Sequence, residues 1–310
     1  MRTKQELTDA IRRDRRAVLV VNTHSRRGQK LYEAARTRLA EAGFELLGRY
    51  PVHNPQDDLE KALAAALELG PDLLIAGGGD GTISTAARML AHRDVALGLL
   101  PLGTTNNFAR TAHIPLDLDE AVAVLADGKV IDLDLGLSGG EPFTNHVGVG
   151  LSAEVMLKAP RPLKRILGRF AYPLTALALL ARHRPLRITV QAGGREHEFL
   201  SHQVYVANGG HHAGRPIAGD ADADDRLLVA YPVGGSSRWE LLRETARNAA
   251  LGERRTLRDE PFLATGELLL ETDRPARAEV DGEPSGRTPL RLGLAANALR
   301  VMAPEGTPDR

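Results

Sequence analysis

The sequence predicts an α/β N-terminal domain with a parallel sheet, followed by a mainly antiparallel β-sandwich domain. In roughly the first 135 residues, short apolar runs alternate with segments of helical period, which is the pattern of strand, helix and strand. After about Ile131, strand-like pieces are separated by turns rich in Gly, Pro, Asp and Ser. A chain of 310 residues is long enough for each of two domains to bury its own core.

The N-terminal elements follow from apolar runs and from residues that start or end helices. The clearest helix begins at Asn54, which can cap it, has Pro55 at the first helical position, and ends at Gly70. Two aspartates in its first turn favour the positive end of the helix dipole. The elements expected in this domain are strands at 17–22, 44–50, 72–76 and 95–100, and helices at 29–42, at 54–70 and from the glycine run to about residue 91.

The C-terminal elements are expected as short strands with two helical inserts. We place the domain boundaries so that residues 1–133 form the α/β domain, residues 134–294 form the β-rich domain, and residues 295–310 pack back onto the first domain. The expected strands lie at 186–192, 197–210, 226–233, 266–272, 276–283 and 297–304, and the inserts lie around 163–181 and 238–251.

Composition narrows the class of protein. The 40 basic and 40 acidic side chains cancel, which argues against a protein that tracks nucleic-acid backbones nonspecifically. The absence of cysteine excludes disulfides, thiolate catalysis and Cys-ligated zinc, and it suits a reducing cytoplasm. The N-terminus carries charges up to Arg16 and does not resemble a signal peptide, so we expect a cytoplasmic protein.

One apolar segment has the composition of a membrane-surface helix. The run Phe170–Ala181 has 12 uncharged residues and contains Pro173, so it is well short of the roughly 20 needed to span a bilayer. Basic residues flank it in the manner of an interfacial segment. The alternative is an ordinary core helix with basic ends. The flanking residues are Lys158, Arg161, Lys164, Arg165, Arg169 and Arg182.

The stretch GGGDGT, residues 77–82, follows the strand at 72–76 and precedes a helix. Unobstructed backbone N–H groups and a helix N-terminus favour a phosphate ligand. Asp80 would repel a bare phosphate, so its presence indicates either a bridging Mg²⁺ or a carboxylate that orients a nucleophilic hydroxyl. A tight strand-to-helix turn is the simpler alternative, although three consecutive glycines exceed what a turn needs.

A second polar loop, PLGTTNNFAR at 101–110, follows the next strand. Thr104, Thr105 and Asn106 supply hydrogen-bond donors, and Arg110 can pair with phosphate. Ligands of open parallel sheets bind outside the carboxyl ends of the strands, where both loops lie. Two such loops at consecutive strand ends predict a nucleotide site, although each alone could be a polar turn.

Several familiar motifs are absent or lack their context. The sequence has no G-x-x-x-x-G-K-[ST], so a P-loop is excluded. GVGLSA at 148–153 matches a permissive dinucleotide pattern, but no strand-end acid follows some 20 residues later. The histidine pairs His197/His202 and His211/His212 lack the spacing of a zinc site.

Two groups of acidic residues late in the chain allow two interpretations each. The segment GDADADDRLLV is either a site for a hard cation or a solvated acidic turn; its acids are Asp220, Asp222, Asp224 and Asp225. VDGEPSG presents Asp281 and Glu283 on a tight turn, which could also be a D-G hairpin corner without further function.

The order of these motifs resembles that of the bacterial diacylglycerol kinase and lipid kinase family, which also includes sphingosine and ceramide kinases. The resemblance spans roughly residues 18–304. GGGDGT alone is less specific than the ordered set, because NAD kinases share a GGDGT loop. The matching segments are VNTHSRRG, GGGDGT, PLGTTNNFAR, DLDLGLSGGEPFTNHVGVG, VANGGHHAGRPIAGDADADDRLLV and AEVDGE.

The resemblance implies a Rossmann-like domain of the NAD kinase and diacylglycerol kinase type that binds ATP, and a β domain that supplies the lipid acceptor. Asp80 would also lie near Mg²⁺, Asp134 matches an acid of the metal-linked network, and Asp225 with the backbone of Leu227 matches a structural Mg²⁺ site. The resemblance assigns nucleotide contact to Asn22, Ser25, Gly78, Gly79, Asp80, Gly81, Thr82, Thr104 and Asn106.

The general base implied by the resemblance is Asp281 or Glu283, with Glu283 favoured slightly. It would take the proton of the lipid hydroxyl.

The sequence departs from the family pattern in four places. Thr23 stands where Pro is usual, and Arg26 and Arg27 replace a small, usually glycine-containing stretch. Asn107 occupies a position often held by Asp, and Arg226 replaces Gly after the double acid. If residue 226 needs positive φ, that replacement costs roughly 1 to 2 kcal/mol.

We therefore expect an ATP- and Mg²⁺-dependent kinase that phosphorylates diacylglycerol or a related lipid while peripherally bound to a membrane, as in phospholipid biosynthesis. A soluble-metabolite kinase of NAD-kinase type and a non-catalytic lipid or nucleotide sensor are the alternatives. Nucleic acid is not an expected partner. An exposed strand edge in the β domain could support a homodimer.

Overall fold

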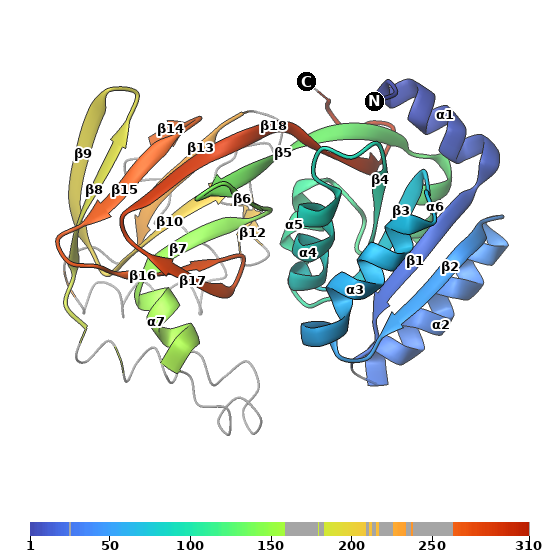
Figure 1. The fold of residues 1–310 in the computed structure, drawn as a ribbon, viewed down its shortest axis with the longest axis horizontal. Coiled ribbons are helices and arrows are strands. Elements are labelled where there is room, and N and C mark those ends of the chain that lie inside the picture. The colour runs from blue at the N-terminus through green and yellow to red at the C-terminus, as the bar shows by residue number, and fades with distance from the viewer. Residues whose placement is uncertain are drawn as a thin grey trace.

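The computed structural model describes residues 1–24, 26–158, 179, 183–208, 211–212, 215–216, 226–233, 237 and 263–309. Figure 1 shows two lobes, an α/β lobe and a β lobe, bridged by two long strands, β5 (Lys129–Ser138) and β18 (Leu290–Ala303). Both chain termini lie at the same end of the α/β lobe. The expected helical inserts around 163–181 and 238–251 fall almost wholly outside the described residues.

The α/β lobe is built on a parallel sheet in the order β2-β1-β3-β4, which confirms the predicted class. Every residue of β3 and β4 is buried, as expected for parallel strands covered by helices on both faces. Its strands are β1 (Arg16–Asn22), β2 (Glu45–Val52), β3 (Leu73–Gly78) and β4 (Ala96–Pro101), and its helices are α1 (Lys4–Asp14), α2 (Arg26–Glu41), α3 (Pro55–Glu68), α4 (Asp80–Leu90), α5 (Asn107–Thr111) and α6 (Leu118–Asp127).

Three of these helices, α1, α5 and α6, were not predicted. Thr3 caps α1 in a capping box with Glu6, and the helix buries Leu7 and Ile11. The α6 helix begins after Asp117, whose carboxylate accepts two backbone N–H groups of the first turn. The capping residues of α1 and α6 were visible in the sequence, but only a few apolar residues follow each of them.

The β lobe is a sandwich of two sheets, which confirms the predicted antiparallel class. One sheet has six strands in the order β14-β13-β10-β7-β16-β17, and the other contains β15, β8 and β9. Buried residues such as Val149, Val206 and Ile188 fill the space between the two sheets. The remaining elements are β6 (Glu141–Phe143), β7 (His146–Gly150), α7 (Leu151–Lys158), β8 (Leu186–Ala192), β9 (Arg195–Ser201), β10 (Gln203–Asn208), β11 (His211–His212), β12 (Arg215–Pro216), β13 (Leu228–Val233), β14 (Leu263–Thr265), β15 (Leu268–Thr272), β16 (Arg277–Val280) and β17 (Glu283–Arg287).

The segment 197–210 was expected as one strand-like piece, and the structure divides it. β9 pairs with β8 in the first sheet, whereas β10 pairs with β7 and β13 in the second. The chain crosses between the sheets at Ser201 and His202, both fully buried. The corner consists of the polar residues Ser201, His202 and Gln203 and contains no Gly or Pro, so the sequence carried no turn signal there.

One continuous sheet connects the lobes. β18 pairs antiparallel with β5 along most of its length and parallel with β4 at Val301 and Leu97, so the sheet runs without interruption from β2 to β9. The boundary that we placed after residue 133 lies inside β5, and residues 299–303 of β18 lie within the α/β lobe.

A buried carboxylate stabilises the irregularity where β18 passes between the lobes. The register with β5 shifts between Ala295 and Leu299, and Asn297 there has φ +52°. Asp134, only 1% exposed, accepts the backbone N–H of Asn297 at 2.8 Å and that of Arg226 at 3.1 Å. Arg226 has φ +60°, which is the strained conformation considered for this position from the sequence.

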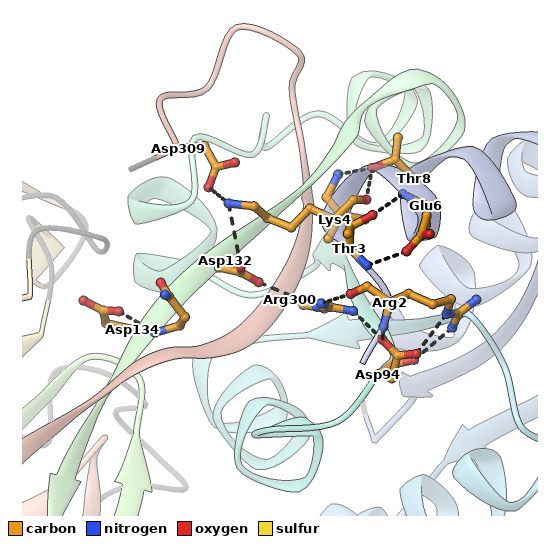
Figure 2. A network of polar contacts seen from close by, with 12 residues as sticks. Arg2, Thr3, Lys4, Glu6, Thr8, Asp94, Asp132, Asp134, Arg300 and Asp309 are labelled. Atoms are coloured by element: carbon orange, nitrogen blue, oxygen red, sulfur yellow. Dashed lines mark hydrogen bonds and ion pairs between the residues drawn. The ribbon is translucent and has the colours of Figure 1, made fainter.

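A polar network fastens the N-terminus, β18 and the C-terminus to one another (Figure 2). Arg300 of β18, with a side chain 8% exposed, contacts the carboxylate of Asp94 and the carbonyl oxygen of Arg2. Arg2 donates its Nε to Asp94 at 2.9 Å. Lys4 reaches Asp309 at 2.8 Å and lies 3.7 Å from Asp132. Both ends of the chain are therefore held against the same edge of the parallel sheet.

The pKa values of two acids in this network move in opposite directions. Partial burial works against ionisation of Asp94, but its hydrogen bond to Arg2 and the charges of Arg2 and Arg300 hold its pKa below the ordinary value. Burial is the larger effect at Asp132 and raises its pKa despite Lys4 and Arg300. Asp94 is therefore the acid whose ionisation stabilises the fold.

We expect the Asp94→Asn protein to lose about 2 kcal/mol of unfolding free energy at pH 7, less than for a fully buried pair because Asp94 is partly exposed. Since the folded pKa of Asp94 is lowered, its contribution is present above the unfolded pKa and disappears as the pH falls through the folded value. Urea unfolding at pH 7 and pH 3 measures both effects. Asp14→Asn, at an exposed pair with Arg13, is the matched control with no measurable change expected. Equal stabilities of wild type and Asp94→Asn at pH 7 would contradict this account.

Candidate active site between the two lobes

The loops that follow β3 and β4 touch each other. A Cβ atom on Gly103 would lie 2.5 Å from the Cα of Gly79, and one on Gly78 would lie 2.5 Å from Oγ1 of Thr82. A side chain on Gly81 would meet nothing within 4 Å, and this residue is exposed. Packing therefore requires glycine at 78 and 103, whereas Gly81 opens the start of α4 to a ligand.

Asn106 shapes the second loop from inside. It adopts φ +49°, and its side chain is buried. The amide oxygen accepts the N–H of Gly103 at 3.0 Å, and Nδ2 donates to the carbonyl oxygens of Pro101 and Gly103, both at 3.2 Å. Both amide donors are thus engaged within the loop. The geometry gives Asn106 a loop-forming role, and the nucleotide contact expected from the resemblance stays a prediction.

Asp80 connects the two loops. Its Oδ2 accepts the hydroxyl of Thr105 at 2.6 Å, and its Oδ1 lies 3.4 Å from the backbone N of Phe108. Arg110 donates Nε to the carbonyl oxygen of Thr105 at 3.0 Å and braces the same loop. Thr104 and Thr105 are exposed. The carboxylate of Asp80 is therefore held at the mouth of both loops.

The end of β1 joins this group. Asn22 donates Nδ2 to Oγ1 of Thr82 at 3.3 Å and accepts the N–H of His24 at 3.1 Å. The hydroxyl of Thr23 is hydrogen-bonded to Nδ1 of His53 at 2.9 Å. Thr23, which stands where the family usually has Pro, thus fixes the loop through its side chain. Ser25 and the side chains of Arg26 and Arg27 lie outside the described part of the chain.

The D-G corner between β16 and β17 is a two-residue hairpin turn, since Val280 pairs with Glu283. Asp281 has φ +49° and Gly282 φ +87°, as a type I′ turn requires. The Asp281 carboxylate accepts the hydroxyl of Ser84 at 2.5 Å. Its other four donors are the N–H and Oγ1 of Thr144, at 2.7 and 2.9 Å, and the N–H groups of Asn145 and His146, at 2.7 and 3.0 Å.

These contacts separate the roles of the two acids in the turn. A carboxylate has about four lone-pair sites, and five donors already point at Asp281, so it is a poor acceptor for a substrate proton. The side chain of Glu283 is exposed and, within the described residues, forms no hydrogen bond or ion pair. It lines a cavity of about 240 Å³ together with Gly81, Ser84 and Arg88 of α4. Glu283 is thus the acid of the turn that is accessible to a substrate.

Because Ser84 follows Asp80 by one helical turn, the bond to Asp281 docks the hairpin against the helix that begins at Asp80. The predicted residues of the α/β loops and of the D-G turn, which lie far apart in the chain, are thereby brought together.

Sequence reasoning missed two further residues next to the D-G turn, His146 and Glu279. Nε2 of His146 lies 3.1 Å from Oε1 of Glu279, and Oε2 of Glu279 accepts the N–H of Gly282 at 2.9 Å. The Glu279 side chain is 2% exposed. A Cβ on Gly148 would lie 2.2 Å from Oε1 of Glu279, so the first glycine of GVGLSA makes room for this carboxylate. The only signal in the sequence was a glutamate inside an apolar strand, AEV.

The residues that could hold a metal are few in the described part of the chain. No group of three or more His, Asp or Glu side chains is arranged there to bind an ion. Mg²⁺ in nucleotide sites commonly uses one or two carboxylates together with phosphate oxygens, and Asp80 fits that arrangement. Of the residues expected at a structural metal site, Leu227 is exposed and Asp225 lies outside the described residues. Asp134 is engaged with the β18 irregularity, and a metal role for it stays a prediction.

None of the helices that the structure describes is long and apolar enough to cross a membrane.

The contact between the loops predicts opposite effects of two alanine substitutions. Gly103→Ala should lower the free energy of unfolding by about 2 kcal/mol, because the new methyl group meets backbone atoms that cannot move aside. Gly81→Ala should raise it by about 0.5 kcal/mol, since the added methyl is unobstructed and alanine favours the helix. Chemical denaturation of both proteins measures the difference. A Gly103→Ala protein as stable as Gly81→Ala would show that the loops do not touch.

Comparisons with known proteins match the two lobes in turn. The family described as "Diacylglycerol kinase catalytic domain" matches residues 16–138, and that described as "YegS C-terminal NAD kinase beta sandwich-like domain" matches residues 145–303. A Pseudomonas aeruginosa (strain UCBPP-PA14) protein named "Probable lipid kinase YegS-like" is 32% identical over 95% of this chain and 97% of its own length. The "Diacylglycerol kinase" of Bacillus subtilis (strain 168) is 29% identical over 76% of this chain and 78% of its own.

A solved structure agrees in fold. The crystal structure of a diacylglycerol kinase from Bacillus anthracis str. Sterne aligns with a TM-score of 0.71 at 22% identity, over 94% of this chain and 97% of that one. The family matches cover both lobes, and the 32% identity extends over nearly the whole of both chains. The resemblance drawn from the order of the motifs is confirmed: the chain belongs to the lipid kinase family that includes the YegS-like kinases and the bacterial diacylglycerol kinases.

Proposed function

We propose that this enzyme transfers the γ-phosphate of ATP to the hydroxyl of a membrane lipid, diacylglycerol or a related lipid, in the cleft between the glycine loops and the D-G hairpin. The observation that carries the proposal is the bond between Ser84 and Asp281. It joins the helix that begins at Asp80 to the turn that presents Glu283. The open backbone at Gly81, suited to phosphate, and the carboxylate of Glu283, suited to a hydroxyl proton, therefore line one cavity.

The α/β lobe supplies the phosphate side of this cleft. The open backbone at Gly81, the exposed hydroxyls of Thr104 and Thr105, and the N-terminus of α4 suit the phosphates of ATP. Asp80 would hold Mg²⁺ together with those phosphates, where the ion would neutralise charge that develops during transfer. Asn106 and Gly103 would contribute by fixing the loop.

The β lobe supplies the acceptor side. As the lipid oxygen attacks the γ-phosphorus and the bond to the leaving ADP breaks, Glu283 would accept the hydroxyl proton. Its exposed, uncommitted carboxylate supports this assignment, and the saturated carboxylate of Asp281 supports a role in holding the turn. The sequence preference for Glu283 over Asp281 therefore gains a physical reason.

Peripheral membrane contact is proposed from the sequence alone. The apolar run Phe170–Ala181 and the basic residues around it suit a membrane surface. A homodimer through an exposed strand edge also stays a proposal; β9, at the end of the ten-stranded sheet, offers such an edge.

Transfer of labelled γ-phosphate from ATP and Mg²⁺ to a panel of lipids in mixed micelles tests the proposal. We expect label in one lipid class and a loss on the order of 10³-fold in the Asp80→Asn protein, which still folds because Asp80 is partly exposed. NAD serves as the soluble control. Label in NAD would make the enzyme a metabolite kinase, and ATP binding with no transfer to any acceptor would make it a sensor.

Substitution of the two acids of the turn should distinguish a residue that acts in phosphoryl transfer from one that stabilises the turn. Glu283→Gln should reduce kcat by about 10²-fold or more, as loss of a general base does, without changing the thermal unfolding temperature. Asp281→Asn should instead lower stability, because an amide nitrogen would face N–H donors that lack an acceptor. Steady-state kinetics and thermal unfolding of both proteins provide the measurement. A fully active Glu283→Gln protein would remove Glu283 from the mechanism.

A further inference from the structure

A buried hydrogen-bonded pair lies directly behind the turn that carries Glu283. His146 begins β7, and Glu279 lies on the adjacent strand β16. One oxygen of Glu279 meets the His146 ring at 3.1 Å, and the other accepts the N–H of Gly282 at 2.9 Å. Gly282 is the residue immediately before Glu283. A chain of two hydrogen bonds thus runs from the imidazole to the backbone of the turn.

The backbone of His146 binds the same turn a second time. Its N–H donates to Oδ1 of Asp281 at 3.0 Å, and its carbonyl oxygen accepts the N–H of Asp281 at 2.9 Å. The side chain of His146 fixes Gly282 through Glu279, while its main chain fixes Asp281. Both turn residues are therefore held by one residue of β7.

The surroundings of His146 favour its charged form. Among the described residues, Glu279 of β16, Asp281 of the turn and Asp80 of α4 are the acids whose charges act on it, and Tyr205 of β10 packs edge-on at 5.4 Å between ring centroids. Burial alone would disfavour the imidazolium, but the hydrogen bond to Glu279 and the three negative charges raise the pKa of His146 above its ordinary value. The buried carboxyl group of Glu279 has His146 and the N–H of Gly282 as its hydrogen-bond partners.

We propose, building on the proposed function, that His146 and Glu279 are positioning residues for phosphoryl transfer. They hold the Asp281–Gly282 turn so that the carboxylate of Glu283 stays aligned with the acceptor hydroxyl. Neither residue needs to touch the nucleotide, so their loss should affect turnover and leave ATP binding intact. A displacement of about 1 Å in a catalytic group costs up to about 10²-fold in rate, which sets the scale of the effect.

Two substitutions of His146 test this role. His146→Leu removes the hydrogen bond to Glu279, and we expect kcat to fall about 10- to 100-fold with KM for ATP within twofold of wild type. His146→Gln keeps an N–H donor that can reach Glu279, and we expect it to restore most of kcat. His197→Leu, on the exposed strand β9, is the control for loss of a histidine and should leave kcat unchanged.

The pH profile adds a readout that a merely structural residue would not move. Because the folded pKa of His146 is raised, the contribution of the charged pair is lost as the pH rises through that value. We expect a fall of wild-type kcat at high pH that is missing in His146→Gln. In NMR spectra of the imidazole groups, Glu279→Gln should lower the titration midpoint of His146.

The outcomes distinguish this inference from the proposed function. A wild-type protein that transfers no phosphate refutes the proposed function before any substitution is made, and a role in transfer falls with it. If wild type transfers phosphate and folded His146→Leu keeps the wild-type kcat, the positioning role is wrong. It is also wrong if His146→Leu and His146→Gln lose kcat and thermal stability equally, because the pair would then act only in folding.

Discussion

The carboxylate of Asp281 joins three segments that are distant in sequence, because donors from two of them reach an acid of the third. Ser84 lies on the helix after the glycine run, Thr144 to His146 begin the first strand of the second sheet, and the turn itself lies near the end of the chain. A carboxylate that accepts this many hydrogen bonds is costly to form unless all donors arrive together. The relative position of the two lobes at the site therefore depends on this one group.

The ten-stranded sheet brings the two lobes close enough for Asp281 to bind its donors. β5 and β18 run from one lobe into the other, so the lobes are joined by paired backbone and not by a flexible linker. Asp134 supports the irregular part of β18, and Arg300 fastens its last residues beside Asp94. The continuous sheet fixes the two lobes relative to each other on one side of the cleft. The contact between the D-G hairpin and α4 fixes them on the other side. A cleft built in this way holds Asp80 and Glu283 in fixed positions relative to each other.

Much of the fold followed from the sequence, because local patterns determine it. The strands of the parallel sheet are continuous apolar runs, and the loops after β3 and β4 were expected at the same sheet edge, where they are found. The site was only partly predictable. The D-G-E turn and the family resemblance identified Asp281 and Glu283, but not the hydrogen bonds of Asp281, which come from Ser84 and Thr144 in distant segments. His146 and Glu279 belong to no motif, and only strand pairing brings them together.

The glycines of GGGDGT show why a motif identifies a site more easily than the role of each residue. Gly77 lies against Val21 and Leu102, and Gly78 makes room for Thr82, so packing accounts for these two. Gly79 lies opposite Gly103, where it is residue 103 that has no room for a Cβ. Gly81 has no packing reason and is exposed. A simple strand-to-helix turn does not require the contact between the two loops. A phosphate site requires little more than an open backbone at the start of the helix. The run serves both purposes at once, which explains why it exceeds the requirement of either.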